Sequence, residues 1–207
     1  QDEIFFHSDA VQTIGRYQDF KIYPSMSALS ISSHKINGPK GVGALWVKGG
    51  AELLQRQFGG SQEREMRPGT ENLPGIVGFA KACELWQTEG DHFRSCMLKV
   101  RNEFEHRLKR EIPGIYIHGE TENRLVNTSC VSFPGLAADM LLLGLDMAGI
   151  QASAGSACAA GAVKSSRVIR NLGFCEEYAS ATIRFSFGMG NQQTDLDEII
   201  PKIKDLV

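Results

Sequence analysis

The sequence lacks the features that mark several common classes of protein. Its 207 residues include 22 basic and 24 acidic side chains, and the net charge of −2 provides no basic excess for nucleic acid or anionic lipid. The longest apolar run, Met140 to Leu145, is far shorter than the roughly 20 residues that span a bilayer. Repeats and low-complexity tracts are absent. We therefore expect a globular protein that binds neither nucleic acid nor membranes.

Cysteine is scarce, and its spacing indicates no metal site. The five cysteines are Cys83, Cys96, Cys130, Cys158 and Cys175. No two have C-x-x-C spacing, so neither a zinc site nor a thioredoxin-like pair is indicated. An odd number cannot pair completely within one chain, and no signal peptide is visible. These features favour a cytoplasmic, reducing setting with free thiols.

Hydrophobic periodicity predicts a mixture of short strands and helices. A first strand is expected at residues 4–6 with His7-Ser8-Asp9 as its polar end, and further strands at 28–33, 44–48, 115–118, 127–133 and 182–187. Helices are expected at 76–86, 93–108, 137–148 and from 194 onward. Thr194 and Asp197 approximate a capping box, and Pro201 predicts a kink or a break in the last helix. The helices at 76–112 would connect a three-strand α/β part, residues 1–75, to a compact α+β part, residues 113–207.

One cluster of polar residues follows the second predicted strand. Ser32-Ser33-His34-Lys35 places a lysine beside hydroxyl and imidazole groups. Such a lysine is a plausible Schiff-base nucleophile when positive charge or desolvation lowers its pKa, and the serine and histidine could hold a phosphate. A surface lysine at a strand end is the simpler interpretation from spacing alone. Lys40, in the following turn, is an equally good candidate.

Two charged residues at strands could also contact a ligand. Asp9 ends the first predicted strand, at the carboxyl end where open α/β sheets bind ligands. Its carboxylate could pair with a protonated pyridine nitrogen, although a turn aspartate is the alternative. Arg184 lies among apolar strand residues and needs an anion. That anion could be a substrate carboxylate or an internal carboxylate.

The stretch from Ser153 to Gly161 contains only small residues around Cys158. Small side chains have little to pack, so we expect this loop to be mobile. A cysteine on a mobile loop can enter a site and leave it again, which suits a sulfur carrier. A small buried thiol in tight packing is an equally good interpretation.

Five stretches in order resemble the cysteine desulfurases, pyridoxal-phosphate enzymes of fold-type I in the class V aminotransferase superfamily. They are His7 to Gln12, Ser32 to Gly41, Gly59 to Thr70, Ser153 to Cys158 and Thr182 to Gly188. They cover nearly the whole chain. The resemblance implies an α/β fold, the C-terminal part of a large, mostly parallel sheet domain followed by a small α+β domain.

The resemblance also implies a role for each matching residue. Pyridoxal phosphate would be held by Lys35 as a Schiff base, by Asp9 at the ring nitrogen, by Gln12 at the phenolic oxygen and by Ser32 and His34 at the phosphate. Thr70 would reach the phosphate in the other subunit of a homodimer. Arg184 would bind the carboxylate of the substrate, L-cysteine. The implied catalytic set is Cys158, Lys35 and His34. Cys158 would take the sulfur as a persulfide and pass it to a sulfur-acceptor scaffold protein for iron–sulfur cluster or thio-cofactor synthesis.

The family's upstream motifs do not occur in this sequence. They are a glycine-rich phosphate-binding turn, a histidine that stacks on the cofactor ring and an asparagine near the phenolic oxygen. We therefore expect the C-terminal part of a longer enzyme, inactive alone. The alternatives are a selenocysteine lyase or class V aminotransferase relative, or a non-catalytic interaction fragment. Cys158 argues against an aminotransferase, which needs no nucleophilic thiol.

Overall fold

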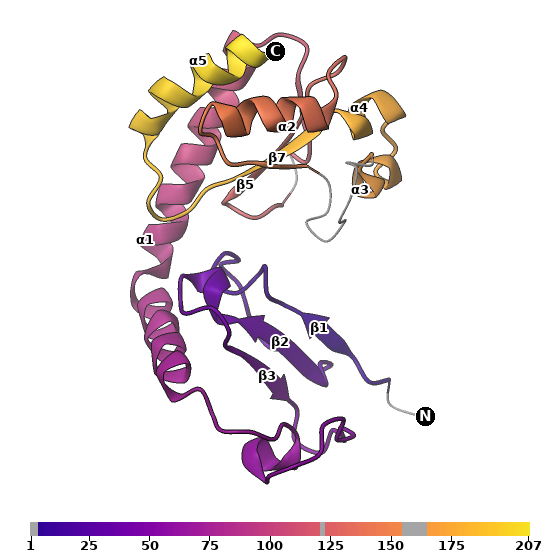
Figure 1. Ribbon diagram of the computed structural model, residues 1–207, viewed down its shortest axis with the longest axis vertical. Coiled ribbons are helices and arrows are strands. Elements are labelled where there is room, and N and C mark those ends of the chain that lie inside the picture. The colour runs from indigo at the N-terminus through magenta and orange to yellow at the C-terminus, as the bar shows by residue number, and fades with distance from the viewer. Residues whose placement is uncertain (1–3, 121–122, 155–164) are drawn as a thin grey trace. The chain divides into compact units, whose positions relative to one another are not determined.

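The computed structural model describes residues 4–120, 123–154 and 165–207 (Figure 1). The chain forms two compact units, Gln1–Asp91 and His92–Val207. The boundary lies inside one helix, α1 (Leu73–Glu111), where the sequence predicted two helices. A lone glycine, Gly90, costs a helix only about 1 kcal/mol, so it does not interrupt α1. The predicted division at residues 75 and 112 stays a prediction.

The first unit contains a three-stranded sheet in the order β1–β2–β3 (Figure 1). Its strands are β1 (His7–Asp9), β2 (Ala28–Ser32) and β3 (Gly43–Val47). β1 pairs parallel with β2, with His7 opposite Ala28, and β3 pairs antiparallel with β2. A short 3-10 helix, η1 (Ser33–Ile36), follows β2, and another, η2 (Gln62–Glu65), lies in the glycine-rich loop.

The first predicted strand is confirmed at its polar end, because β1 is the segment His7–Asp9, but residues 4–6 are not part of it. Ile4, Phe5 and Phe6 are exposed and lie outside the sheet. The carbonyl of Phe6 accepts from the Ser27 and Ala28 N–H groups, but Ala28, the first residue of β2, already lies opposite His7, so β2 has no residue opposite 4–6. The other five predicted strands lie within one residue of the observed ends.

The N-terminal part of α1 packs on the first unit through a small apolar cluster. Phe79 and Ala82, three residues apart on one helix face, are buried with Ile36 of η1. Ile31 of β2 and Trp86 of α1 are partly buried against them. This cluster holds η1 against a rigid helix.

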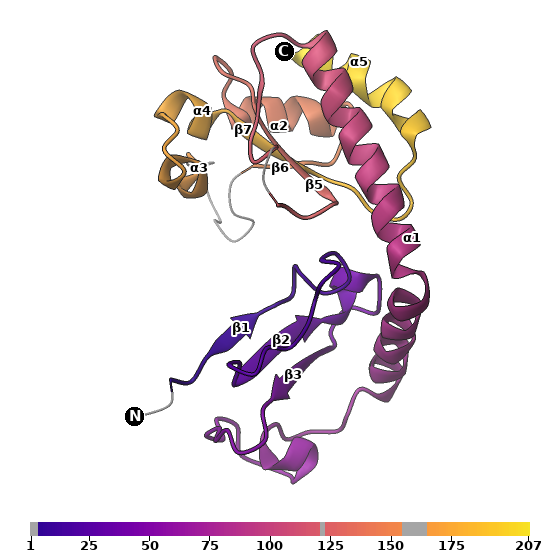
Figure 2. The same ribbon diagram turned by 180° about the vertical axis from the view of Figure 1, so that it is seen from behind.

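The second unit contains a four-stranded antiparallel sheet in the order β4–β5–β7–β6. Its elements are β4 (Tyr116–Ile117), β5 (Thr128–Ser132), α2 (Ala138–Met147), β6 (Ser153–Ala154), α3 (Arg167–Asn171), α4 (Glu176–Ser180), β7 (Thr182–Ser186), η3 (Gln193–Asp195) and α5 (Leu196–Leu206). Helices α2 and α5 lie side by side (Figure 2). Within the described residues, no helix is long and apolar enough to cross a membrane.

Alternation along the strands of this second sheet separates an apolar face from a polar face. Val131, Ile183 and Phe185 are buried in the core with the second half of α1, α2 and α5. Phe104 of α1 has its ring centroid 4.9 Å from that of Phe185. The intervening residues, including Cys130 and Arg184, lie on the opposite face.

The start of the last helix differs from the prediction. The capping box joins Gln192 and Asp195, whose carboxylate accepts from the Gln192 N–H at 2.9 Å, rather than Thr194 and Asp197. Pro201 causes no break, since α5 continues to Leu206. Ile200 and Ile203 are fully buried on either side of Pro201, and their packing holds the helix on the core.

Candidate functional site

The parallel pairing of β1 and β2 brings two of the predicted site residues to one edge of the first sheet. Asp9 is the last residue of β1 and lies opposite Ser30, and Ser32 is the last residue of β2. Ligands bind at the carboxyl ends of strands in open α/β sheets. One Asp9 carboxylate oxygen accepts from the Val11 N–H at 3.1 Å, which fixes the side chain at the start of a turn. Asp9 is otherwise exposed.

Directly after β2, η1 adds further polar groups at this edge. The hydroxyl of Ser32 and Nδ1 of His34 are 2.8 Å apart. Lys35 follows on the same turn and is half-buried, and no carboxylate among the described residues forms an ion pair with it. A hydroxyl, an imidazole and an ammonium group therefore lie within four residues, which is a suitable arrangement for a bound anion.

Buried contacts hold this turn in place. The Trp86 indole N–H donates to the carbonyl of Ile36 at 3.0 Å, and the Gly38 N–H donates to the carbonyl of Ser33 at 3.0 Å. A Cβ atom at Gly38 would lie 2.2 Å from the Ser33 hydroxyl oxygen, so any other residue there would force the turn or the Ser33 side chain to shift. Ser33 itself is fully buried, and its hydroxyl has no hydrogen-bond partner. Lys35 is thus carried by a closely packed turn.

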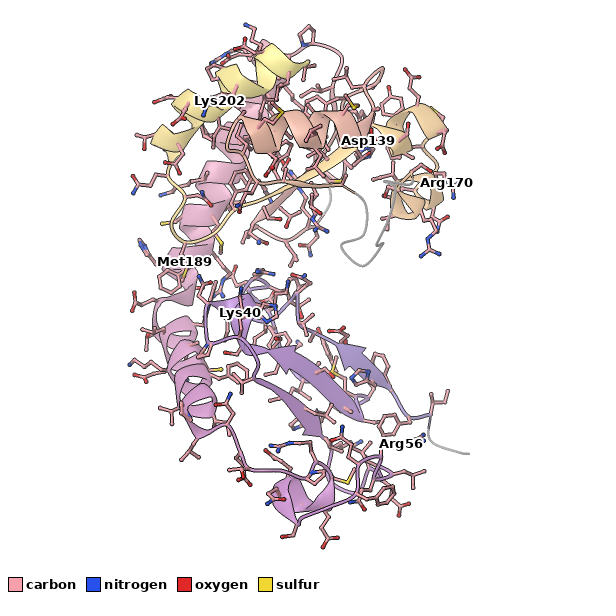
Figure 3. All side chains as sticks on the ribbon, in the orientation of Figure 1. Lys40, Arg56, Asp139, Arg170, Met189 and Lys202 are labelled. Carbon is pink, nitrogen blue, oxygen red and sulfur yellow. The ribbon has the colours of Figure 1, made fainter. Side chains whose placement is uncertain are left out.

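Lys40 lies beyond this turn and is exposed (Figure 3). It lies between Pro39 and Gly41, in the stretch of chain that leads into β3. It shares no hydrogen bond with Ser32 or His34. The structure favours Lys35 over Lys40 only by this placement, and the choice between the two stays a prediction.

Gln12 and Thr70 come from segments outside the strands. Gln12 follows β1 and is exposed, and its side-chain oxygen accepts from Arg16 at 2.5 Å. Thr70 is exposed in the loop after η2. No described contact joins either residue to Ser32 or His34, so their predicted roles stay predictions.

The loop before Thr70 has an unusual backbone that the sequence did not indicate. Glu63, Arg64 and Glu65 have φ angles of 48°, 58° and 67°, in the left-handed region. Each such non-glycine residue costs on the order of 1 kcal/mol or more, and such strain is concentrated at ligand-binding sites. None of these three residue types favours that conformation, so residue preferences could not have predicted it.

In the second unit, Arg184 of β7 lies opposite a small residue on each of the two neighbouring strands. It pairs with Cys130 of β5 on one side and with Ser153 of β6 on the other. Arg184 is half-buried, and no carboxylate among the described residues forms an ion pair with it. Burial raises the pKa of the Cys130 thiol, and the positive charges of Arg184 and Arg124 oppose that rise. The internal salt bridge considered for Arg184 is therefore not found in the described part of the chain.

Cys158, the predicted sulfur acceptor, lies outside the described residues. The flanking chain is described on both sides. Ser153 and Ala154 form β6, and the Ser166 N–H donates to the carbonyl of Ala179 at 2.9 Å.

Sequence reasoning also missed a buried polar cluster on the same sheet face as Arg184. His118 Nε2 lies 2.6 Å from the Ser132 hydroxyl, which lies 2.7 Å from the Thr182 hydroxyl. Both hydroxyls bond the carbonyl of Tyr178 in α4. The ring of Phe174 stacks edge-on against His118, with centroids 4.5 Å apart. The alternation of strand residues placed these side chains on one face, but nothing in the sequence indicated their partners.

Comparison with known proteins places this geometry in a family. The aminotransferase class-V family matches residues 1–199. A cysteine desulfurase of Gluconacetobacter diazotrophicus is 38% identical over 202 residues, which are 98% of this chain and 50% of that protein. Cysteine desulfurase IscS of Methanosarcina thermophila is 37% identical over 207 residues, 100% of this chain and 51% of that protein.

A solved structure has the same fold. The NifS-like protein from Rickettsia africae superposes with a TM-score of 0.85 at 31% identity, covering 98% of this chain and 53% of that one. The expected fold class is thereby confirmed. The chain spans about half the length of the curated relatives it matches.

Proposed function

This chain belongs to the aminotransferase class-V family, and we propose that it supplies the C-terminal part of a cysteine desulfurase. The observation that carries the proposal is the placement of Asp9 and Ser32 at the carboxyl ends of the paired strands β1 and β2, with His34 and Lys35 on the turn that follows. Relatives named cysteine desulfurase, 36–39% identical to this chain, support the choice of reaction. A cytoplasmic location stays a prediction.

Members of this family are pyridoxal-phosphate enzymes, and the residues at this edge fit that cofactor. Ser32 and His34 offer hydrogen-bonding groups for a phosphate. Asp9 offers an anion to a protonated ring nitrogen, and Lys35 offers an amine with no ion-pair partner among the described residues. When bound, the cofactor withdraws electrons from the amino-acid substrate.

The chain's own residues then have distinct tasks in the proposed reaction. Arg184 binds the carboxylate of L-cysteine, for which its guanidinium has suitable paired N–H donors. The Cys158 thiolate attacks the sulfur of the substrate, because the thiolate is the nucleophilic form. The S–S bond forms as the C–S bond breaks, and the carbon takes up a proton. L-alanine and a persulfide on Cys158 result, so no external oxidant is needed.

Two partners belong to this proposal. Thr70 would reach the phosphate in a second subunit, which makes a homodimer part of the site. The persulfide on Cys158 would pass to a sulfur-acceptor protein of iron–sulfur cluster or thio-cofactor synthesis. The name IscS, which several relatives carry, supports that destination.

Reductive trapping tests which lysine holds the cofactor. The chain is incubated with pyridoxal phosphate and borohydride, digested, and analysed by mass spectrometry. We expect the adduct on Lys35, abolished by Lys35→Ala and retained in the matched variant Lys40→Ala. An adduct that survives Lys35→Ala at the same yield would refute the assignment.

A further inference from the structure

Helix α2 is apolar on two opposite faces, and only one of them is covered. Ala138, Leu141 and Leu145 are buried in the core of the second unit. At a helical advance of about 100° per residue, Met140, Leu143 and Met147 form a stripe on the other side. Their exposed fractions are 66%, 55% and 82%. A helix that is apolar all round is normally buried, so this outer stripe indicates a second contact surface.

An acidic pocket adjoins the start of this helix. A cavity of about 450 Å³ is lined by Gly135, Leu136, Ala137, Ala138, Asp139, Glu177 and Ser180. Its two ionisable side chains, Asp139 and Glu177, are both acidic and exposed. Neither forms an ion pair with the described residues. Figure 3 labels Asp139 at the end of α2 that lies beside α4, the helix that carries Glu177.

The charges around the stripe favour a cation. The start of a helix carries about half a positive charge, which two carboxylates outweigh. α2 contains no lysine or arginine, and Asp146 adds a further exposed carboxylate to it. At the other end of α2, Lys202 donates to the carbonyl of Ala148 but also to Glu198, so its charge is already paired.

We propose that the α2 stripe and the Asp139–Glu177 pocket together bind a basic amphipathic helix of a partner protein. Apolar residues of that helix would cover Met140, Leu143 and Met147, since helices dock through anchors at i, i+3 and i+7. One lysine or arginine would enter the pocket between Asp139 and Glu177. Methionine side chains adapt readily to a partner surface. This surface goes beyond the proposed catalytic function and does not depend on it.

Two designed peptides test the proposal on the intact chain. Each is a fluorescein-labelled amphipathic helix of about 18 residues with leucine at i, i+3, i+4 and i+7 spacing. One carries lysine on its polar face, and the other carries glutamate at the same positions. Fluorescence anisotropy measures binding to the chain. We expect the lysine peptide to bind and the glutamate peptide to bind at least about tenfold more weakly.

Two independent pairs of substitutions locate the site. We expect the double variant Asp139→Asn with Glu177→Gln, and the double variant Met140→Ser with Met147→Ser, each to weaken lysine-peptide binding at least about tenfold. All four side chains are exposed, so both variants should fold, which circular dichroism checks. The control, Val168→Ser with Leu172→Ser, removes two exposed apolar side chains, one in α3 and one directly after it, and should leave binding unchanged.

Three results would overturn the proposal. They are equal binding of the two peptides, unchanged binding in both double variants, and a self-associated chain that Met140→Ser with Met147→Ser converts to monomer. The last result, measured by sedimentation, would make a second copy of this chain the occupant of the stripe.

Discussion

His118 Nε2 and the Ser132 hydroxyl oxygen lie 2.6 Å apart, at one end of a buried hydrogen-bond network. Ser132 and Thr182 have one hydroxyl proton each. If His118 donates to Ser132, then Ser132 can donate to Thr182, and Thr182 to the Tyr178 carbonyl. The distances fit either direction, because Ser132 can instead donate its proton to Nε2 or to the Tyr178 carbonyl. The other nitrogen, Nδ1, is buried without a partner.

This arrangement predicts that acid destabilises the second unit through His118. Burial lowers the pKa of His118 below its usual 6.5, because protonation would bury a charge and an unpaired Nδ1–H. Below pH 6.5 the unfolded chain binds more protons than the folded chain, so stability falls as pH falls. The slope from this group approaches at most about 1.4 kcal/mol per pH unit.

Urea unfolding at pH 7.5 and pH 5.5 measures this effect against a variant that cannot titrate. His118→Gln keeps an amide donor for Ser132 and should lose less stability between the two pH values than the natural chain. Carboxylates titrate in both proteins, so only the difference between them reports on His118. Identical losses would show that His118 does not control the acid sensitivity.

A second prediction concerns the packing under Lys35. Gly38→Ala should destabilise the first unit by about 1–3 kcal/mol, because its Cβ would lie 2.2 Å from the Ser33 hydroxyl oxygen. It should also reduce the yield of the borohydride-trapped adduct. Adding Ser33→Ala removes the clashing atom and should restore part of both quantities. Gly49→Ala, where a Cβ meets open space, is the control. No rescue by Ser33→Ala would contradict this account of the turn.

The substrate contact and the sulfur acceptor are best tested in a complete enzyme. A fusion of the N-terminal half of the Gluconacetobacter diazotrophicus relative to residues 1–207 supplies one, since this chain matches about half of that protein. In the fusion, Arg184→Gln should raise KM for L-cysteine at least about tenfold, the loss expected for one charged contact. Arg170→Gln, an exposed arginine on α3, is the control. An unchanged KM would remove Arg184 from the substrate site.

Cys158→Ser in the same fusion should abolish sulfide release while the visible absorbance of the bound cofactor remains. Cys175→Ser should retain sulfide release, although this thiol is exposed. If Cys158→Ser released sulfide at the normal rate, another cysteine would have to be the sulfur acceptor.

Local patterns predicted most of the elements but not the contacts between them. The alternation of apolar and polar residues predicted five of the strands closely. When one face of a sheet is buried, every second residue of a strand has to be apolar. The first strand was predicted to start too early, because its start depends on where β2 begins to offer a partner, which is a long-range property. The capping box was misplaced because several polar residues near Thr194 could cap the last helix equally well.

The candidate site shows the same division. Asp9, Ser32, His34 and Lys35 were predicted from their strand ends and from family resemblance, and parallel pairing brings them to one edge. The support beneath them was not predictable, because the bond from Trp86 to Ile36 joins residues 50 positions apart. The residues of the His118 network likewise come from two separate strands and a helix.

The most direct test of the central claim is alanine formation by the fusion from L-cysteine and pyridoxal phosphate. We predict one L-alanine for each sulfide released in the presence of a thiol reductant, and loss of both products with Lys35→Ala. Residues 1–207 alone should give no comparable turnover, because the family's upstream cofactor-binding motifs do not occur in them. A fusion that binds the cofactor but forms no alanine, or turnover by residues 1–207 alone near that of the relative, would contradict the account.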